Sequence, residues 1–297
     1  MSLGAPPRAL RIATRGSALS LAQTGIAVSL LREAHVASEV MVVRSSGDRS
    51  PDVPAALMEG QGWFTAELEQ AVLDGRADAA VHSAKDLPTE LGSGLTVVAY
   101  LPRGDARDAV VTRDGVGLTS LHSGAIIGTS SPRREAFLRA LRPDVRAVPM
   151  RGNVDTRLRK LDEGECDALL LAAAGLDRLG RGDRIAERLD PHRFVPAPAQ
   201  GVIAVEAHRD GTAAAACAPL DDSTSRAAVR AEREVLRRLG AGCRLPLGAW
   251  ARVEEGRLVL VGALAAVDGS VHTAEMSGGL DDPRALGAAV AAALGAR

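Results

Sequence analysis

The sequence predicts an α/β protein whose sheets are mainly parallel, followed by a small α+β domain. Two observations lead to this fold class. From residue 9 to residue 206, short apolar segments alternate with helical stretches, which is typical of strands joined by crossover helices. Beyond Asp222 the pattern changes to one long helical stretch and three strand-like segments, with hairpin turns at Glu254-Glu-Gly256 and Asp268-Gly269.

The expected elements fall into three series. The first has strands at 9–14, 40–44, 79–81 and 95–99, with helices at 19–32 and 64–73. The second has strands at 109–112, 125–128, 145–148 and 168–172, with helices that start near Ser131 and Val154. The third has a helix at 226–239 capped by Ser223-Thr-Ser225, strands at 247–253, 257–265 and 270–275, and a last helix from Asp282.

At 297 residues the chain is long enough for two or three domains. Proline-bearing segments at 101–106 and 196–201 look like crossovers between two lobes. The apolar strand that follows the second crossover either rejoins the first sheet or belongs to the second domain, because the pattern is the same for both. We expect a first domain of 1–101 with a returning segment 199–220, a second domain of 102–198 and a C-terminal domain of 221–297.

The composition argues against several classes of protein. The net charge is −1 and aromatic residues make up 2%, so the chain has neither a global basic field nor a stacking platform for nucleic acid. No apolar run reaches the roughly 18–20 residues of a membrane helix, and the N-terminus lacks the apolar stretch of a signal peptide. Cys166, Cys217 and Cys243 are odd in number and widely spaced, which favours neither a disulfide framework nor a metal site. We therefore expect a cytoplasmic protein without metal, nucleic-acid or membrane partners.

Two arginine-rich runs are the most informative motifs. Gly128-Thr-Ser-Ser-Pro-Arg-Arg134 and Arg151-Gly-Asn-Val-Asp-Thr-Arg157 each follow an expected strand and open an expected helix. Ser130 or Ser131 suits the cap of the first helix, and Pro132 suits its first helical position. Helix starts and guanidinium groups both bind anions. The runs therefore predict a ligand with several negative groups between the two helix starts, although a solvated arginine-rich surface is the alternative for any single arginine.

Polar residues also follow the strand at 79–81, in the run His82-Ser83-Ala84-Lys85-Asp86. In parallel α/β sheets ligands bind beyond the carboxyl ends of strands. Asp86 could stabilise or exchange protons with a cationic reacting group while Lys85 contacts an anionic one. The alternative is a surface ion pair of little energetic weight. Lys85 stands out because Lys160 is the only other lysine among 36 basic residues.

Two further strand ends carry polar residues. Arg15 ends the first strand, with Ser17 as the expected cap of the next helix, and Asp48 follows the second strand. The glycines near them match neither a Walker loop nor a dinucleotide-binding fingerprint. Several strand ends thus deliver arginine or aspartate toward one expected crevice.

Cys243 differs from the other two cysteines. It lies in Gly240-Ala-Gly-Cys243, where glycines let the backbone approach a neighbour closely and present the sulfur. Cys166 and Cys217 lie among alanine and acidic residues and are expected to be small core fillers. A loop cysteine is more often inert than reactive, so the residues alone leave the role of Cys243 open.

These motifs occur in one order along nearly the whole chain. They include Leu10-Arg-Ile-Ala-Thr-Arg-Gly-Ser17, Gln23, Gly47-Asp48, Phe64 with Glu67-Leu-Glu69, Val81-His-Ser-Ala-Lys-Asp86, Gly128-Thr-Ser-Ser131, Arg133-Arg134, Arg151-Gly-Asn-Val154, Arg178-Leu-Gly180, Gln200-Gly201, Gly242-Cys243 and Pro246-Leu-Gly248. Any one of them alone is weak, but the ordered set resembles the porphobilinogen deaminase (hydroxymethylbilane synthase) family.

The resemblance implies two lobes folded like type II periplasmic binding proteins, with a crevice between them, and a small C-terminal domain. It implies a monomeric transferase of tetrapyrrole and haem biosynthesis. Such an enzyme joins four porphobilinogen molecules head to tail, releases ammonia at each addition and frees hydroxymethylbilane by hydrolysis. The resemblance also implies a dipyrromethane cofactor, attached through a thioether to Cys243.

The resemblance further implies roles for individual residues. Asp86 is expected to be the catalytic carboxylate, near pyrrole nitrogens that become positively charged. Cofactor and substrate carry acetate and propionate groups, which polar and basic residues would bind. The expected binding set is Arg15, Ser17, Gln23, Asp48, Phe64, Ser83, Lys85, Thr129, Ser130, Ser131, Arg133, Arg134, Arg151, Gly152, Asn153, Arg157, Arg178 and Gln200.

The alternative function is a non-catalytic, two-lobed binding protein for a polycarboxylate or another anion. Arginine-headed helices alone would serve such a protein equally well. The presence of both Asp86 and Cys243 argues against it, because a protein that only binds an anion needs neither.

Overall fold

The computed structural model of the chain describes residues 8–43, 65–240, 245–266 and 268–295. Contacts divide the chain into two units. The first comprises Met1–Leu101 and Ile203–Asp222, and the second comprises Pro102–Val202 and Ser223–Arg297. The separation of residues 221–297 as a domain of their own stays a prediction.

The first unit is built on a five-stranded sheet of order β2-β1-β3-β10-β4. β1 (Leu10–Arg15) pairs in parallel with β2 (Ser38–Val43) and with β3 (Ala79–Ser83). β10 (Ile203–His208) lies between β3 and β4 (Leu95–Tyr100) and is antiparallel to both. The strand whose place the sequence left open therefore belongs to the first unit.

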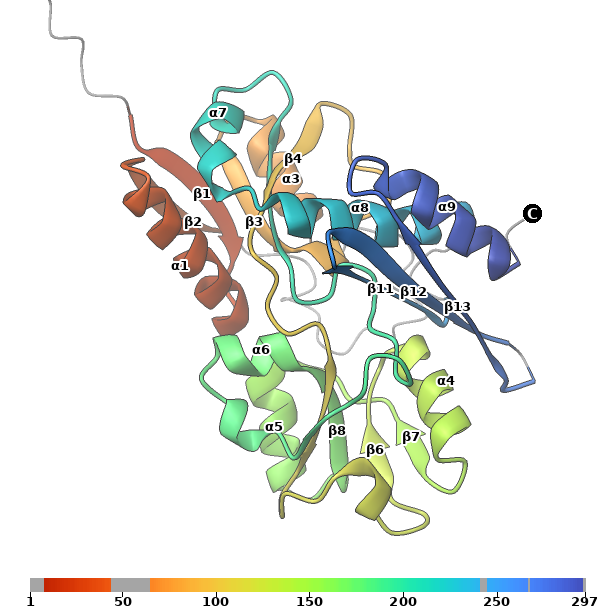
Figure 1. The fold of residues 1–297 in the computed structure, drawn as a ribbon. Coiled ribbons are helices and arrows are strands. Elements are labelled where there is room, and N and C mark those ends of the chain that lie inside the picture. The colour runs from red at the N-terminus through yellow and green to blue at the C-terminus, as the bar shows by residue number, and fades with distance from the viewer. Residues whose placement is uncertain (1–7, 44–64, 241–244, 267, 296–297) are drawn as a thin grey trace, which may run out of the picture. The chain divides into compact units, whose positions relative to one another are not determined.

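Helices cover both faces of this sheet (Figure 1). α1 (Ala18–Glu33) packs Ala27 and Leu31 against Ile12 and Val81 on one face. α3 (Ala66–Leu73) packs Leu68, Ala71 and Val72 against Ala13 and Ala80 on the other face. Successive residues of a strand point to opposite faces, so β1, β3 and β4 supply both clusters. The remaining short elements of the unit are η1 (Ala84–Asp86), α7 (Ala213–Cys217) and η4 (Ala218–Leu220).

The second unit contains a sheet of the same design, of order β7-β6-β8-β5-β9. Its strands are β5 (Asp108–Thr112), β6 (Ile126–Gly128), β7 (Arg146–Val148), β8 (Ala168–Ala172) and β9 (Glu187–Arg188). Its helices are η2 (Leu118–Ser120), α4 (Pro132–Leu141), α5 (Val154–Asp162), α6 (Ala173–Arg178) and η3 (Gly182–Arg184). β5, which follows the first crossover, is antiparallel to β8, as β10 is to β3 in the first unit. This strand order confirms the predicted fold class of two type II periplasmic-binding-protein-like lobes, while the crevice between them stays a prediction.

The C-terminal residues form an antiparallel three-stranded sheet with two helices. The strands are β11 (Leu247–Glu254), β12 (Arg257–Ala265) and β13 (Val271–Gly278), and the helices are α8 (Ser223–Arg238) and α9 (Pro283–Ala293). The predicted hairpin between β11 and β12 is confirmed, with positive φ angles at Glu255 and Gly256. α8 begins at Ser223, earlier than the predicted 226, so the serine expected to cap the helix is its first residue.

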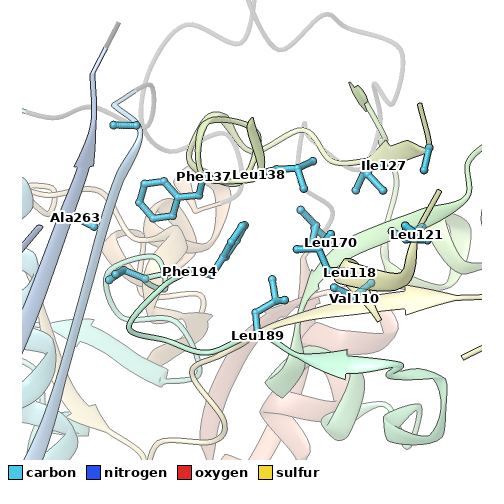
Figure 2. Close-up of a cluster of buried hydrophobic side chains, with 14 of the residues drawn as sticks. Val110, Leu118, Leu121, Ile127, Phe137, Leu138, Leu170, Leu189, Phe194 and Ala263 are labelled. Carbon is cyan, nitrogen blue, oxygen red and sulfur yellow. The ribbon is translucent and has the colours of Figure 1, made fainter. Parts of the chain in front are cut away.

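The C-terminal sheet packs onto the lobe of the second unit through a shared apolar cluster (Figure 2). Phe137 of α4 and Phe194 meet edge to face, with ring centroids 5.7 Å apart. Val261 and Ala263 of β12 lie in the same cluster. Phe137 and Leu138 of α4 thus pack against residues of the lobe's own sheet and of β12. Close packing of this kind restrains the position of the helix and of its first turn.

Candidate functional site

In the first unit, the end of β1 and the start of α1 carry Arg15 and Ser17. Ser17 is the cap of α1, as predicted, and its hydroxyl accepts a hydrogen bond from the Ser20 amide at 3.2 Å. One turn further along α1, the amide of the buried Gln23 donates to Ser83 Oγ at 2.8 Å. The first helix is therefore tied directly to the end of β3.

The end of β3 places Lys85 and Asp86 at the surface of the first unit. The strand ends at Ser83, and η1 turns the chain so that Ala84 and Leu87 are buried while Lys85 and Asp86 are exposed. Within the described residues, no hydrogen bond or ion pair holds the Asp86 carboxylate, so the surface ion pair considered above is not formed. The carboxylate is available to a ligand.

In the second unit, the start of α4 follows the predicted pattern. Ser131 caps the helix, accepting from the Arg134 amide at 3.4 Å, and Pro132 is its first residue. The Thr129 amide donates to Val148 O at 2.9 Å, and Ser130 Oγ donates to Met150 O at 2.9 Å. The ends of β6 and β7 are thereby joined side by side.

The start of α5 is built in the same way. Asn153 caps the helix, and its side-chain oxygen accepts from both the amide and the hydroxyl of Thr156, at 2.9 and 2.8 Å. Gly152 has a φ of +106°, and a Cβ there would come within 2.7 Å of the Thr156 methyl carbon, so only glycine fits. Arg151 precedes this turn at the end of β7, half-buried.

Arg133 and Arg134 are not solvated surface residues. They are only 5% and 7% exposed, and both contact the fully buried Asp108 of β5. Arg133 Nη1 lies 2.8 Å from Asp108 Oδ2, and Arg134 Nη2 lies 2.7 Å from Asp108 Oδ1. Further donors of the two guanidinium groups reach the carbonyl oxygens of Val195 and Leu170, at 2.8 and 3.0 Å.

The two arginines determine the ionisation of Asp108. Burial alone raises the pKa of this carboxyl, but the charges of Arg133 and Arg134, with hydrogen bonds from Arg133 and Gln200, outweigh burial and bring the pKa well below its ordinary value. Asp108 is therefore a carboxylate at neutral pH. The single Asp108 carboxylate pairs with two guanidinium groups, so the three side chains together carry a net positive charge.

Arg157 of α5 adds a third cation to this region. Its Nε donates to Gly152 O at 2.8 Å, and no ion pair joins it to a carboxylate in the described part of the chain. Burial and, to a lesser extent, the charge of Arg134 lower the pKa of Arg157 to about 10. The starts of α4 and α5 therefore carry three guanidinium groups, of which Arg133 and Arg134 contact the Asp108 carboxylate.

Arg178 and Gln200 lie beside the crossover segments of the second unit. Arg178 Nη2 donates to Gly201 O at 2.5 Å, and burial lowers the pKa of this arginine although Asp177 partly offsets the effect. The Gln200 amide donates to Ala106 O at 2.8 Å and to Asp108 Oδ1 at 3.1 Å. Gln200 is thus part of the support of Asp108.

Sequence reasoning missed Asp108, which organises this region. The available signal was an acidic residue at the first position of an apolar strand, because a buried carboxylate needs a cationic partner. It also missed the buried pair of Arg103 with Glu232, whose Nη1 and Oε1 atoms lie 2.5 Å apart.

Three predicted site residues, Asp48, Phe64 and Cys243, lie outside the described residues. Cys166 and Cys217 are buried, which confirms that they are core fillers, and burial raises the pKa of Cys217 to about 11. Within the described ranges there is no cluster of metal-ligating side chains and no helix long and apolar enough to cross a membrane.

Comparison with known proteins shows which family the sequence matches. The family model described as porphobilinogen deaminase, dipyromethane cofactor binding domain, matches residues 10–216, and that described as porphobilinogen deaminase, C-terminal domain, matches residues 226–296. The chain is 48% identical over 285 residues to the porphobilinogen deaminase of Roseiflexus castenholzii, covering 95% of this chain and 94% of that protein. It is also 48% identical over 297 residues to that of Mycobacterium marinum, covering 96% and 94%.

Among solved structures, the chain is similar to the methionine-binding protein MetQ, with a TM-score of 0.47, 10% identity and coverage of 72% of this chain and 89% of that one. A periplasmic VFT2 domain of Bordetella pertussis BvgS gives a TM-score of 0.43 and 17% identity, with coverage of 71% and 86%.

Proposed function

The chain belongs to the porphobilinogen deaminase family, and from this premise we propose how its residues carry out the family's reaction. The protein is a hydroxymethylbilane synthase: it joins four porphobilinogen molecules head to tail with loss of ammonia, and hydrolysis then frees the linear tetrapyrrole. We assign it to the transferases, acting in the cytoplasm as a monomer.

The observation that carries the proposal is the unbalanced positive charge at the starts of α4 and α5. Within the described residues, Asp108 is the one carboxylate that pairs with any of Arg133, Arg134 and Arg157. A part-buried guanidinium group without a counterion is costly, and a ligand carboxylate relieves that cost through charge-assisted hydrogen bonds. Dipyrromethane and porphobilinogen carry an acetate and a propionate on each ring, so these residues fit the cofactor and the growing chain.

The binding residues of the second unit are arranged for this task. Exposed backbone amides at the starts of α4 and α5 add partial positive charge where Thr129, Ser130, Ser131, Gly152 and Asn153 lie. We propose that Arg151 and Arg178 bind further carboxylates of the same ligand. When bound, dipyrromethane supplies the pyrrole ring to which the first substrate is joined.

Asp86 is proposed as the catalytic carboxylate. Departure of ammonia leaves an electron-poor substrate ring, and joining the rings places positive charge on pyrrole nitrogens. A carboxylate that is exposed and unpaired within the described residues, as Asp86 is, can stabilise that charge and carry a proton. Arg15, Ser17, Gln23, Ser83 and Lys85 would bind the substrate beside it, together with Asp48 and Phe64.

Cys243 is proposed to hold the cofactor through a thioether. A matched pair of proteins tests this, together with the function itself: the parent and Cys243→Ser, both made in cells that supply porphobilinogen. The parent should be heavier than its sequence by two porphobilinogen units less their ammonia and should release ammonia from porphobilinogen. Cys243→Ser should lack both properties. An unmodified parent without turnover would instead favour the anion-binding alternative.

The role of Asp86 is tested by Asp86→Asn, with Asp74→Asn as the control because Asp74 is an exposed acid of the same unit. Removing preorganised charge near a developing cation typically costs about 100-fold to 1000-fold in rate. Asp86→Asn should lose ammonia release to that extent and melt like the parent, while Asp74→Asn should keep the parent's rate. Near-parental turnover by Asp86→Asn would contradict the assignment.

A further inference from the structure

A second carboxylate, Glu206, lies buried in the sheet that carries Asp86. His82 of β3 and Glu206 of β10 are side-chain neighbours across the antiparallel pairing, in which His82 is opposite Ala204 and Glu206 is opposite Ala80. His82 Nε2 lies 3.2 Å from Glu206 Oε2, and the two side chains are 3% and 0% exposed. This pair belongs neither to the proposed binding residues nor to the proposed catalytic step at Asp86.

The surroundings of the pair are apolar. Because side chains alternate along a strand, Glu206 and His82 point to the same face as Ala80, which packs with Leu68 and Leu95. Within the described residues, neither oxygen of Glu206 has a well-aligned hydrogen bond, and His82 Nε2 has none either. Such a group is expensive to bury, and apolar residues would stabilise the sheet at least as well. Stability alone therefore does not account for the pair.

Glu206 lies at an irregularity of the sheet, and His82 lies one residue before the end of β3. The register between β10 and β4 shifts between Val205 and Glu206, and bulges of this kind re-aim side chains and occur often beside active sites. On the neighbouring strand, His82 is followed at once by Ser83, and then by η1 with Lys85 and Asp86. Glu206 thus contacts the residue that lies four positions before Asp86 in the chain.

We propose that His82 and Glu206 are positioning residues for Asp86. The inference deepens the proposed function and rests on it. The Asp86 carboxylate has no partner of its own within the described residues, so its place depends on the backbone that carries it. Two side chains just before Asp86 anchor that backbone. Ser83 accepts a hydrogen bond from Gln23 on one face of the sheet, and the buried His82 lies 3.2 Å from Glu206 on the other face. Loss of the Glu206 carboxyl group would leave the imidazole without its neighbour and let the Ser83–Asp86 segment shift.

The test compares two acidic residues tied to the same strand. Glu206→Gln replaces the carboxyl group beside His82 with an amide of nearly the same shape. Asp78→Asn is the matched control, because Asp78 immediately precedes β3 and pairs with Arg8 and Arg11 at 2.7 and 3.3 Å. In the cofactor-loaded enzyme, Glu206→Gln should lower kcat about 10-fold to 100-fold, the cost of misplacing a reacting group by about 1 Å, while KM stays close to the parent's. Asp78→Asn should lower the melting temperature and leave kcat unchanged.

If the pair only supports the sheet, Glu206→Gln will behave like Asp78→Asn, and that result would overturn the proposal. A second variant, His82→Leu with Glu206→Met, covers the case in which Glu206→Gln fails to fold, because buried ion pairs often tolerate joint apolar replacement. That double variant should melt near the parent, carry the cofactor mass and still lose kcat. Parental kcat in it would equally refute the positioning role. Absence of ammonia release from the parent itself would refute the proposed function instead.

Discussion

The starts of α4 and α5 look alike in sequence and differ in how their charges are balanced. Both follow a strand, both are capped by a polar side chain, and both carry arginines in the first turn. At α4, Arg133 and Arg134 share Asp108 inside the second unit. At α5, Arg157 contacts a backbone carbonyl oxygen and has no carboxylate within the described residues. The comparison teaches that arginines in equivalent motifs can have different roles. The α4 pair is tied to Asp108 within the fold, whereas Arg157 is the one that we propose to pair with a ligand carboxylate.

The largest effect that tests this difference is expected from Asp108→Asn. The substitution leaves two buried guanidinium groups without their carboxylate, and breaking a buried pair in this way costs about 3–5 kcal/mol. Urea unfolding of the cofactor-free protein, made as Cys243→Ser, measures the cost. Asp144→Asn is the control, because its carboxylate is exposed and Arg142 keeps its contacts with the Leu118 and Leu121 carbonyl oxygens, so the free energy of unfolding should change little. If both substitutions lowered the free energy of unfolding equally, the Asp108 pairs of α4 would contribute no more to stability than a surface ion pair.

The same comparison should depend on pH. Asp108 has a folded-state pKa below its ordinary value, so the stability it contributes is fully present above the unfolded pKa and is lost as pH falls toward the folded one. The difference in unfolding free energy between parent and Asp108→Asn should therefore shrink as pH falls from about 5 toward about 2. A difference that stays constant over this window would mean that Asp108 is not the charged partner of the two arginines.

An intermediate effect is expected from Arg157→Leu, and it should appear in function rather than in stability. Loss of a charge-assisted hydrogen bond to a ligand carboxylate should lower kcat/KM about 10-fold to 100-fold. The cofactor-free protein should melt at or above the parent's temperature, because a desolvated cation has been removed. Arg159→Leu on the same helix is the matched control, since Arg159 is exposed and pairs with Glu163 at 2.7 Å. Equal loss of activity in both variants would remove the special role of Arg157.

The smallest effect is expected from the two helix caps. Asn153 accepts two hydrogen bonds, at 2.9 and 2.8 Å, whereas Ser131 accepts one at 3.4 Å. Asn153→Ala should therefore cost about 1 kcal/mol and Ser131→Ala about 0.5 kcal/mol in unfolding free energy. Thermal or urea unfolding of the two variants checks the order, and a larger loss for Ser131→Ala would show that cap geometry does not govern these helix starts.

The sequence predicted the local features of this region well. Helix starts at Ser131 with Pro132 and at Val154 depend on residues within one turn of each other, and the structure confirms both. The pairing of Arg133 and Arg134 with Asp108 was not predictable in the same way, because it joins α4 to a strand more than twenty residues earlier. What a guanidinium group contacts is a tertiary property, whereas where its helix begins is local.

The same limit applies to the sheets. The sequence predicts β10 as an apolar strand, but its residue pattern does not say which sheet the strand joins. Its pairing with β3 and β4 places it in the first unit. His82 belongs to a polar strand end that the sequence makes visible, whereas its partner Glu206 lies over a hundred residues away in a mainly apolar strand. Residue patterns thus predict strands and candidate site residues, whereas the neighbours of each depend on contacts between distant parts of the chain.

The most direct test of the central claim is the titration of the Arg157 guanidinium by ¹³C NMR in the cofactor-free and cofactor-loaded protein. In the cofactor-free form the midpoint should lie near 10, because burial and Arg134 disfavour the charged group. In the loaded form a ligand carboxylate should stabilise the charge and move the pKa upward. Identical midpoints in the two forms would contradict the account, since Arg157 would then have gained no counterion from the ligand.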